Sequence, residues 1–242
     1  MNDPIINFDK IIKINKNTRK QNKRSFPVPS SSILYGIPGA GKTTFIASLI
    51  LSPVLYIPYD RLMIFASDLQ DDKYQLIKEK FEKIEEKLSK KYKQEVKILT
   101  MSDKLSDVPI IDTLDRKLTT MVVFDDMIEK ANNREHEIVT SYFVRGRRMG
   151  CCTFYLTQSY FEIPRVQRTA SNYLVLFKIN NLFDLKAVHR DVIFDMPLED
   201  FIKMYYDILK DNPHGYVIID MRQVDPLLKI RGTIAPKKIK NE

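Results

Sequence analysis

The chain has 242 residues, of which 44% are hydrophobic, so it can bury a substantial core and is most simply one domain with short extensions. It shows no run of about eighteen apolar residues and no charged-then-apolar leader, so we expect no membrane span and no secretory signal, and a soluble protein of an intracellular compartment. The net charge of +8 favours association with a polyanion, although a solvated basic surface gives the same value.

The basic residues concentrate at the two ends of the chain. Residues 1–30 are polar and basic and are expected to form an arm, with seven lysines and arginines between positions 10 and 24 and no acid among them. A second cluster, Lys237, Lys238 and Lys240, lies in an expected tail over residues 226–242. Such segments can contact DNA phosphates or acidic partners, and a plainly solvated role stays open.

The first motif follows an apolar run at residues 32–35. The segment GIPGAGKT at 36–43 fits the phosphate-loop pattern G-x-x-x-x-G-K-[ST] at every fixed position. Its glycines let backbone N–H groups approach phosphates, Lys42 supplies a mobile positive charge, and the Thr43 hydroxyl can ligate Mg²⁺. A helix predicted over residues 43–51 points its N-terminal dipole at the same place. An ordinary glycine turn between strand and helix is the alternative.

The chain is therefore expected to bind ATP with Mg²⁺. The expected nucleotide-binding residues are Gly36, Ile37, Pro38, Gly39, Ala40, Gly41, Lys42, Thr43 and Thr44.

Alternating strand and helix patterns run through the rest of the chain. Runs rich in β-branched and aromatic residues predict strands at 32–35, 62–66, 96–99, 121–124, 152–157, 173–178 and 216–220. Apolar residues recur every three or four positions over 73–94, which predicts a helix covering the sheet, with partner binding as the alternative role. Residues 53–60 fit poorly as a regular element and predict a loop near the nucleotide. The alternation predicts an α/β fold with a mostly parallel central sheet flanked by helices.

The run MVVFDD at 121–126 is four apolar residues ending in two carboxylates. This is expected where a buried strand emerges at the carboxyl edge of a sheet, and it fits a Walker B motif in the right order after the phosphate loop. We expect Asp125 to hold Mg²⁺ through water, and Asp126 to accept a hydrogen bond from the attacking water or to act as its base. Paired acids are also common on protein surfaces, so this assignment depends on the upstream loop.

A third element is the apolar strand at 152–157, which is followed directly by Gln158. A glutamine at the carboxyl edge of a neighbouring strand can reach the γ-phosphate or position the attacking water. Ligands of open α/β sheets bind at that edge, which favours this role over a glutamine that only faces solvent.

Arginines lie between the second and third elements, in the segment RGRRMG at 145–150. Phosphoryl transfer spreads negative charge over oxygens that an arginine from a neighbouring subunit can stabilise. Arg147 is the first candidate for this finger, with Arg148 and Arg145 behind it. Arg165 and Arg168 are weaker candidates, and a basic patch facing solvent or DNA is the alternative.

Together these motifs resemble the FtsK/HerA superfamily of ring-forming ATPases, and within it the viral genome-packaging ATPases of poxvirus type. The resemblance rests on GIPGAGKT, MVVFDD, RGRRMG and the stretch YLTQSYFEIPRVQRTASNYLVLFKINN at 155–181, and it spans about residues 31–220. In that family a Thr-Gln at a strand end leads into a polar connection and then an apolar strand closing with Phe-Lys. The resemblance implies a P-loop NTPase fold, RecA-like or FtsK-HerA-like, with the ATPase domain at 31–225.

The resemblance also implies an activity: ATP hydrolysis in a homo-oligomeric ring, a pentamer or hexamer, that translocates double-stranded DNA into a preformed capsid. In this scheme Gln158 senses the γ-phosphate and Arg147 acts in trans. It further implies a capsid vertex or membrane-associated virion component as partner, and a location in the virion or in a cytoplasmic virus factory. Cellular relatives usually carry Asp-Glu where this chain has Asp125-Asp126, and the shorter side chain puts the identity of the base in question.

Two other hypotheses fit the phosphate loop. A nucleotide or small-molecule kinase would need an acceptor pocket and a lid, and the chain shows no clear arginine-rich lid. A capsid-assembly component could bind nucleotide without motor activity. For the surface lining a DNA channel, the candidates are Lys130 and Arg134, with a solvated loop as the alternative.

Overall fold

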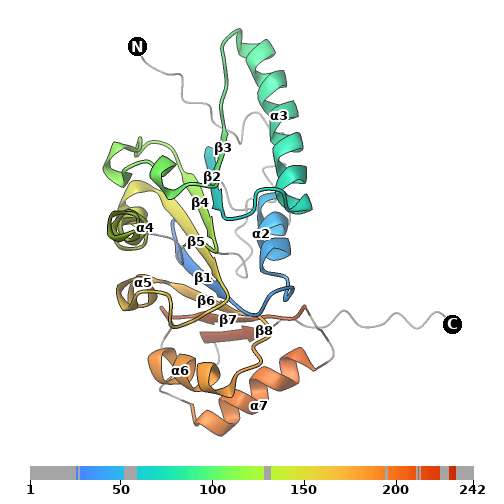
Figure 1. Ribbon diagram of the computed structural model, residues 1–242, viewed down its shortest axis with the longest axis vertical. Helices are drawn as coiled ribbons and strands as arrows, with labels where there is room; N and C mark the ends of the chain where they lie inside the picture. The colour runs from blue at the N-terminus through green and yellow to red at the C-terminus, as the bar shows by residue number, and fades with distance from the viewer. Residues whose placement is uncertain are drawn as a thin grey trace, which may run out of the picture.

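One mixed β-sheet runs through the computed structural model, which describes residues 26, 28–51, 59–127, 132–193, 196–210, 212, 214–223 and 229–232. Within them the sheet has eight strands in the order β3-β2-β4-β5-β1-β6-β7-β8 (Figure 1). The strands are β1 (Ser31–Tyr35), β2 (Arg61–Ala66), β3 (Leu99–Ser102), β4 (Thr120–Asp125), β5 (Cys151–Thr157), β6 (Tyr173–Leu176), β7 (Val217–Asp220) and β8 (Ile230–Gly232). All pairs from β3 to β6 are parallel, and β7 and β8 add an antiparallel edge.

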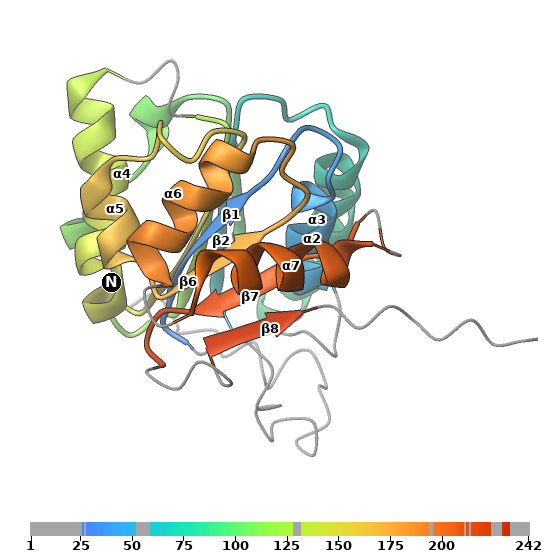
Figure 2. The same cartoon turned by 90° about the horizontal axis from the view of Figure 1, so that it is seen from below.

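Helices cover both faces of the sheet, as Figures 1 and 2 show. The helices are α2 (Lys42–Leu51), α3 (Asp72–Tyr92), α4 (Asn133–Arg145), α5 (Arg165–Ala170), α6 (Leu182–Val192) and α7 (Leu198–Leu209), with short 3-10 turns η2 (Leu105–Asp107), η3 (Ile111–Thr113) and η4 (Gly146–Met149). One core lies under α2 and α3, and the other lies under α4, α6 and α7. None of these described helices is long and apolar enough to cross a membrane.

Burial on both faces explains why the strands are almost continuously apolar. In β4, Met121 and Val123 belong to the core under α2 and α3, while Val122 and Phe124 belong to the core on the other face. A parallel strand covered on both sides requires apolar residues at every position. The predicted α/β fold with a mostly parallel sheet is therefore confirmed.

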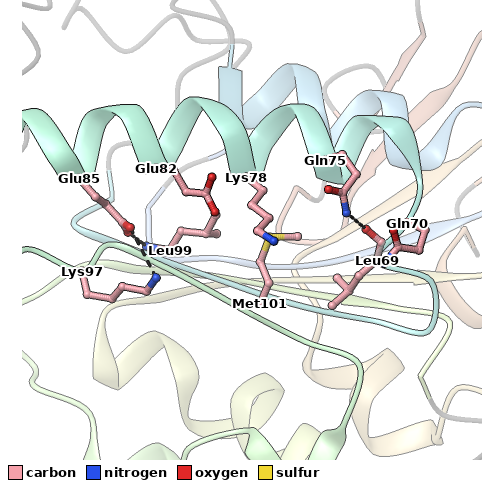
Figure 3. A pocket seen from close by; sticks show the side chains of 9 residues that line it. All are labelled: Leu69, Gln70, Gln75, Lys78, Glu82, Glu85, Lys97, Leu99 and Met101. Atoms are coloured by element: carbon pink, nitrogen blue, oxygen red, sulfur yellow. Dashed lines mark hydrogen bonds and ion pairs between the residues drawn. The ribbon is translucent and has the colours of Figure 1, made fainter.

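The strand predicted at 96–99 is misplaced, because pairing of β3 with β2 starts only at Leu99. The backbone N–H groups of Ile98 and Leu99 both donate to the Glu85 carboxylate of α3 at 2.7 Å. The side chain of Glu85 thus binds this part of the chain before the strand begins (Figure 3). A contact between residues 13 apart in the chain leaves no trace in local periodicity.

Two described segments outside residues 31–225 pack with the sheet. Phe26, expected in the arm, is buried, and its ring packs on that of Tyr173 with centroids 4.9 Å apart. Residues 230–232, expected in the tail, pair with β7 as strand β8. Gly232 permits this contact, because a Cβ there would lie 2.7 Å from the Ile208 side chain of α7.

Several sequence predictions lie outside the described residues. They are the basic run between positions 10 and 24, most of the predicted loop at 53–60, Lys130, and the lysines at 237, 238 and 240.

Candidate active site

The phosphate-loop segment joins β1 to α2 in a conformation that depends on its glycines. Gly39 and Gly41 have φ values of +72° and +104°, in a region that residues with a side chain rarely adopt. Gly36 is required for a different reason, since a Cβ there would lie 2.6 Å from the Cβ of Phe177. The N–H of Ile37 donates to the carbonyl of Lys178 at 3.0 Å, so the loop is held against the chain that leaves β6.

Lys42, the first residue of α2, directs its side chain back into the loop. Its ammonium group donates to the carbonyls of Gly36 at 2.7 Å and Ile37 at 3.2 Å, and the residue is only 7% exposed. Burial lowers the pKa of Lys42, and the nearby carboxylates of Asp126 and Asp125 oppose that shift. The chain therefore places a positive charge among the loop carbonyls, with two negative charges close by.

Asp125 closes β4 and faces the first turn of α2. Its Oδ2 accepts a hydrogen bond from the Thr43 hydroxyl at 3.4 Å and one from the Tyr74 hydroxyl at 2.5 Å. Burial raises the pKa of Asp125 to about 6, against the hydrogen bond from Tyr74, which lowers it. Burial also raises the pKa of Tyr74 far above its usual value, so this phenol keeps its proton and acts as a donor.

Asp126 lies at the rim of the site beside Gln158. Its φ of +49° is in the left-handed region, which aspartate tolerates better than most residues, and its N–H donates to Leu156 of β5 at 3.1 Å. The Gln158 amide donates to Asp126 Oδ2 at 2.5 Å. The turn after β4 therefore brings Asp126 against the end of the neighbouring strand.

The sheet order explains why these residues meet. Strands β4, β5 and β1 are neighbours, and their carboxyl ends carry the paired aspartates, Gln158 and the glycine loop respectively. Lys42, Thr43 and both aspartates thus lie close together, while the Thr44 side chain is exposed. A hydroxyl and a carboxylate oxygen are hard ligands that fit Mg²⁺, which usually keeps several waters and binds nucleotide phosphates as well.

Sequence reasoning missed Tyr74. The helical period that places Tyr74 and Ile77 on the buried face of α3 is visible in the sequence, but it predicts only packing. Nothing in the local pattern shows that this hydroxyl reaches an aspartate 51 positions later.

Arg147 and Arg148 are not at this edge of the sheet. Arg147 and Arg148 lie in η4, immediately before β5, and both are exposed. Strand β5 carries the chain from there to Gln158, and its length of seven residues corresponds to roughly 20 Å, beyond the reach of an arginine side chain.

Arg145 and Arg168 have partners within the chain. Arg145 pairs with Asp112 at 2.5 Å. Arg168 pairs with Asp191 at 3.2 Å and lies over the ring of Tyr160. Arg165, on α5, is exposed.

A cavity of about 350 Å³ opens next to Asp126, at the carboxyl ends of β2, β3 and β4. Its lining residues are Ser67, Asp103, Lys104, Leu105, Ser106, Asp126, Met127 and Glu135. The cavity gives water access to the Asp126 carboxylate. A separate cavity of about 250 Å³ lies between α3 and β3, and Figure 3 shows that its lining includes Glu85 and Lys97.

Comparison with known proteins gives a matching family and several similar solved structures. The family model described as Poxvirus A32 protein matches residues 18–222. The genome packaging NTPase B204 from Sulfolobus turreted icosahedral virus 2, in complex with AMPPCP, is similar with a TM-score of 0.57 and 14% identity, over 85% of this chain and 97% of that chain. B204, the DNA-packaging ATPase from Sulfolobus turreted icosahedral virus, has a TM-score of 0.57 and 13% identity, over 85% and 98% of the two chains. At such identities the likeness shows a shared fold, and no curated protein matches the chain.

Proposed function

The chain belongs to the poxvirus A32 protein family, and on that premise we propose that it is an ATP-driven motor that translocates double-stranded viral DNA into a preformed capsid. The observation that carries the proposal is the convergence of Lys42, Asp125 and Asp126 on the glycine loop at the carboxyl edge of the sheet. The B204 protein, which has the same fold, binds the ATP analogue AMPPCP, and this supports ATP as the nucleotide here.

Each residue of the site has a distinct role in the proposed reaction. Lys42 neutralises charge on the β and γ phosphates. Thr43 and Asp125 would hold Mg²⁺, which would neutralise further phosphate charge. Asp126 accepts the proton of the attacking water. Gln158 fixes the Asp126 carboxylate through their hydrogen bond and contacts the γ-phosphate. The cavity beside Asp126 supplies the water.

A second copy of the chain completes the site in this proposal. Arg147, with Arg148 as the second candidate, is exposed at the amino end of β5 and cannot reach the nucleotide of its own chain. In a homo-oligomeric ring, a pentamer or hexamer, the arginine of one subunit stabilises the transition state in the next. The basic arm and tail, and Arg134 in the first turn of α4, supply contacts to DNA phosphates.

The motor acts at a capsid vertex or on a membrane-associated virion component, in the virion or in a cytoplasmic virus factory. We propose residues 31–225 as the ATPase domain between the basic arm and tail, and Phe26 and residues 230–232 also pack with its sheet.

Phosphate release from ATP, measured with and without linear duplex DNA, tests the proposal. We expect DNA to stimulate release by the unaltered chain, and Lys42→Ala and Asp126→Asn to reduce turnover by about 100-fold or more. Lys80→Ala and Asp207→Asn, at exposed helix positions, are the matched controls and should leave turnover unchanged. Wild-type rates in both site variants would contradict the assignment. Transfer of the phosphoryl group to an acceptor other than water would favour the kinase.

A further inference from the structure

A tyrosine on α3 contacts the carboxylate to which the proposed function assigns the metal. The Tyr74 hydroxyl donates to Asp125 Oδ2 at 2.5 Å, and the same oxygen accepts the longer hydrogen bond from Thr43 at 3.4 Å. Tyr74 is 1% exposed, so no water competes for its hydroxyl. One carboxylate oxygen is thus held between the first turns of two helices, α2 and α3.

The first turn of α3 is itself fixed, so the phenol is held in place. Asp71 caps the helix, accepting the N–H of Lys73 on its side chain at 2.8 Å and the N–H of Tyr74 on its carbonyl at 2.9 Å. The Gln75 side chain donates back to the carbonyl of Leu69 at 2.7 Å, as Figure 3 shows. The Tyr74 ring lies in the core with Ile77, so the hydroxyl has little freedom to leave Asp125.

We propose that Tyr74 is a positioning residue that orients the Asp125 carboxylate for Mg²⁺. Partners of metal-binding carboxylates fix their orientation, and loss of such a partner typically lowers metal affinity by 10–100-fold. Both hydrogen bonds to Asp125 within the described residues are made to Oδ2, so its other oxygen, Oδ1, would be available to Mg²⁺. This inference rests on the proposed function, because it needs a Mg²⁺–nucleotide site.

The substitution Tyr74→Phe removes only the hydroxyl and tests the inference. A fluorescent ATP analogue is titrated onto the protein over a series of Mg²⁺ concentrations and again in EDTA, and the unfolding temperature of the free protein is measured. We expect the half-saturating Mg²⁺ concentration to rise by roughly tenfold, with unchanged affinity in EDTA. Tyr142→Phe is the matched control. Tyr142 is equally buried, and its hydroxyl donates to Pro109 at 2.8 Å, in the core on the other face of the sheet.

An unchanged Mg²⁺ requirement in Tyr74→Phe would overturn the inference. So would an equal loss of affinity in EDTA, or a free protein that unfolds below the titration temperature, because either result would make the hydroxyl a contact for the fold alone. Tyr142→Phe must keep the wild-type Mg²⁺ requirement. Wild-type protein that binds no nucleotide would overturn the proposed function and this inference together, whereas wild-type binding with an unaffected Tyr74→Phe variant overturns the inference only.

Discussion

The two aspartates of the site differ in their surroundings, and the difference fits the roles that we propose for them. Asp125 is half-buried and accepts hydrogen bonds from two hydroxyls, which suits a metal ligand. Asp126 lies beside the open cavity and contacts Gln158, which suits a group that takes a proton from water.

Asp125 is expected to make stability depend on pH. Burial raises the pKa of Asp125 to about 6 in the folded protein, above its value near 4 in the unfolded chain. The contribution of Asp125 to the free energy of unfolding is therefore fully present below about pH 4 and is lost as the pH rises through 6. The substitution Asp125→Asn abolishes this pH-dependent loss of stability, because asparagine does not ionise. In EDTA, we expect the free energy of unfolding of Asp125→Asn, relative to wild type, to increase by about 2 kcal/mol between pH 4 and pH 8.

Urea unfolding at both pH values measures the difference. Asp207→Asn, which removes an exposed carboxyl on α7, is the control and should follow wild type. Parallel pH profiles for wild type and Asp125→Asn would contradict the burial of this carboxylate.

Helix α3 contacts both the outermost strand of the sheet, β3, and the proposed nucleotide site. Its first turn presents Tyr74 to Asp125, and one turn after Phe81 it presents Glu85 to β3 (Figure 3). Both contacts are made by polar groups on the buried face of α3, although its sequence pattern is that of an ordinary amphipathic helix.

Glu85 is expected to be the strongest contact between α3 and the edge strand. Glu85→Ala leaves the N–H groups of Ile98 and Leu99 without their acceptor, and each loss typically costs about 1–3 kcal/mol. We expect the free energy of unfolding to fall by about 2–6 kcal/mol in urea titrations. Glu82→Ala, one turn earlier on α3 and exposed, should change it by less than about 0.5 kcal/mol. Equal effects of the two substitutions would show that the carboxylate does not hold β3.

The sequence predicts the strands that lead into the motifs, and it misses the features that depend on contacts between residues far apart in the chain. The strands at 32–35, 121–124 and 152–157 are confirmed to within one residue, because a buried strand beside a phosphate loop is apolar throughout. The family resemblance is confirmed by the match over residues 18–222. The start of β3, strand β8 and the role of Tyr74 depend on side chains far apart in the chain, which periodicity does not report.

At the scale of the whole molecule, the phosphate loop and Arg147 lie at opposite ends of the parallel strands: the loop follows the carboxyl end of β1, and Arg147 precedes the amino end of β5. A neighbouring copy must therefore supply any arginine of this turn to the nucleotide. Arg147→Ala is expected to bind nucleotide normally and to lose turnover by 10³-fold or more, as for other arginine fingers, by order of magnitude.

Mixing experiments test whether Arg147 acts between subunits. An equal mixture of wild type and Arg147→Ala should hydrolyse ATP at well under half the wild-type rate. Arg190→Ala, which alters an exposed arginine of α6, is the control and should mix without effect. Normal turnover by pure Arg147→Ala would place the finger elsewhere.

Displacement of a third strand from linear duplex DNA measures translocation itself. A short oligonucleotide is annealed to the duplex as a triplex, and its release is followed after the protein and nucleotide are added. The proposed motor predicts release with ATP and Mg²⁺, and no release with a non-hydrolysable analogue or with Lys42→Ala. A third strand that stays bound while the wild-type protein hydrolyses ATP on the same duplex would contradict the motor.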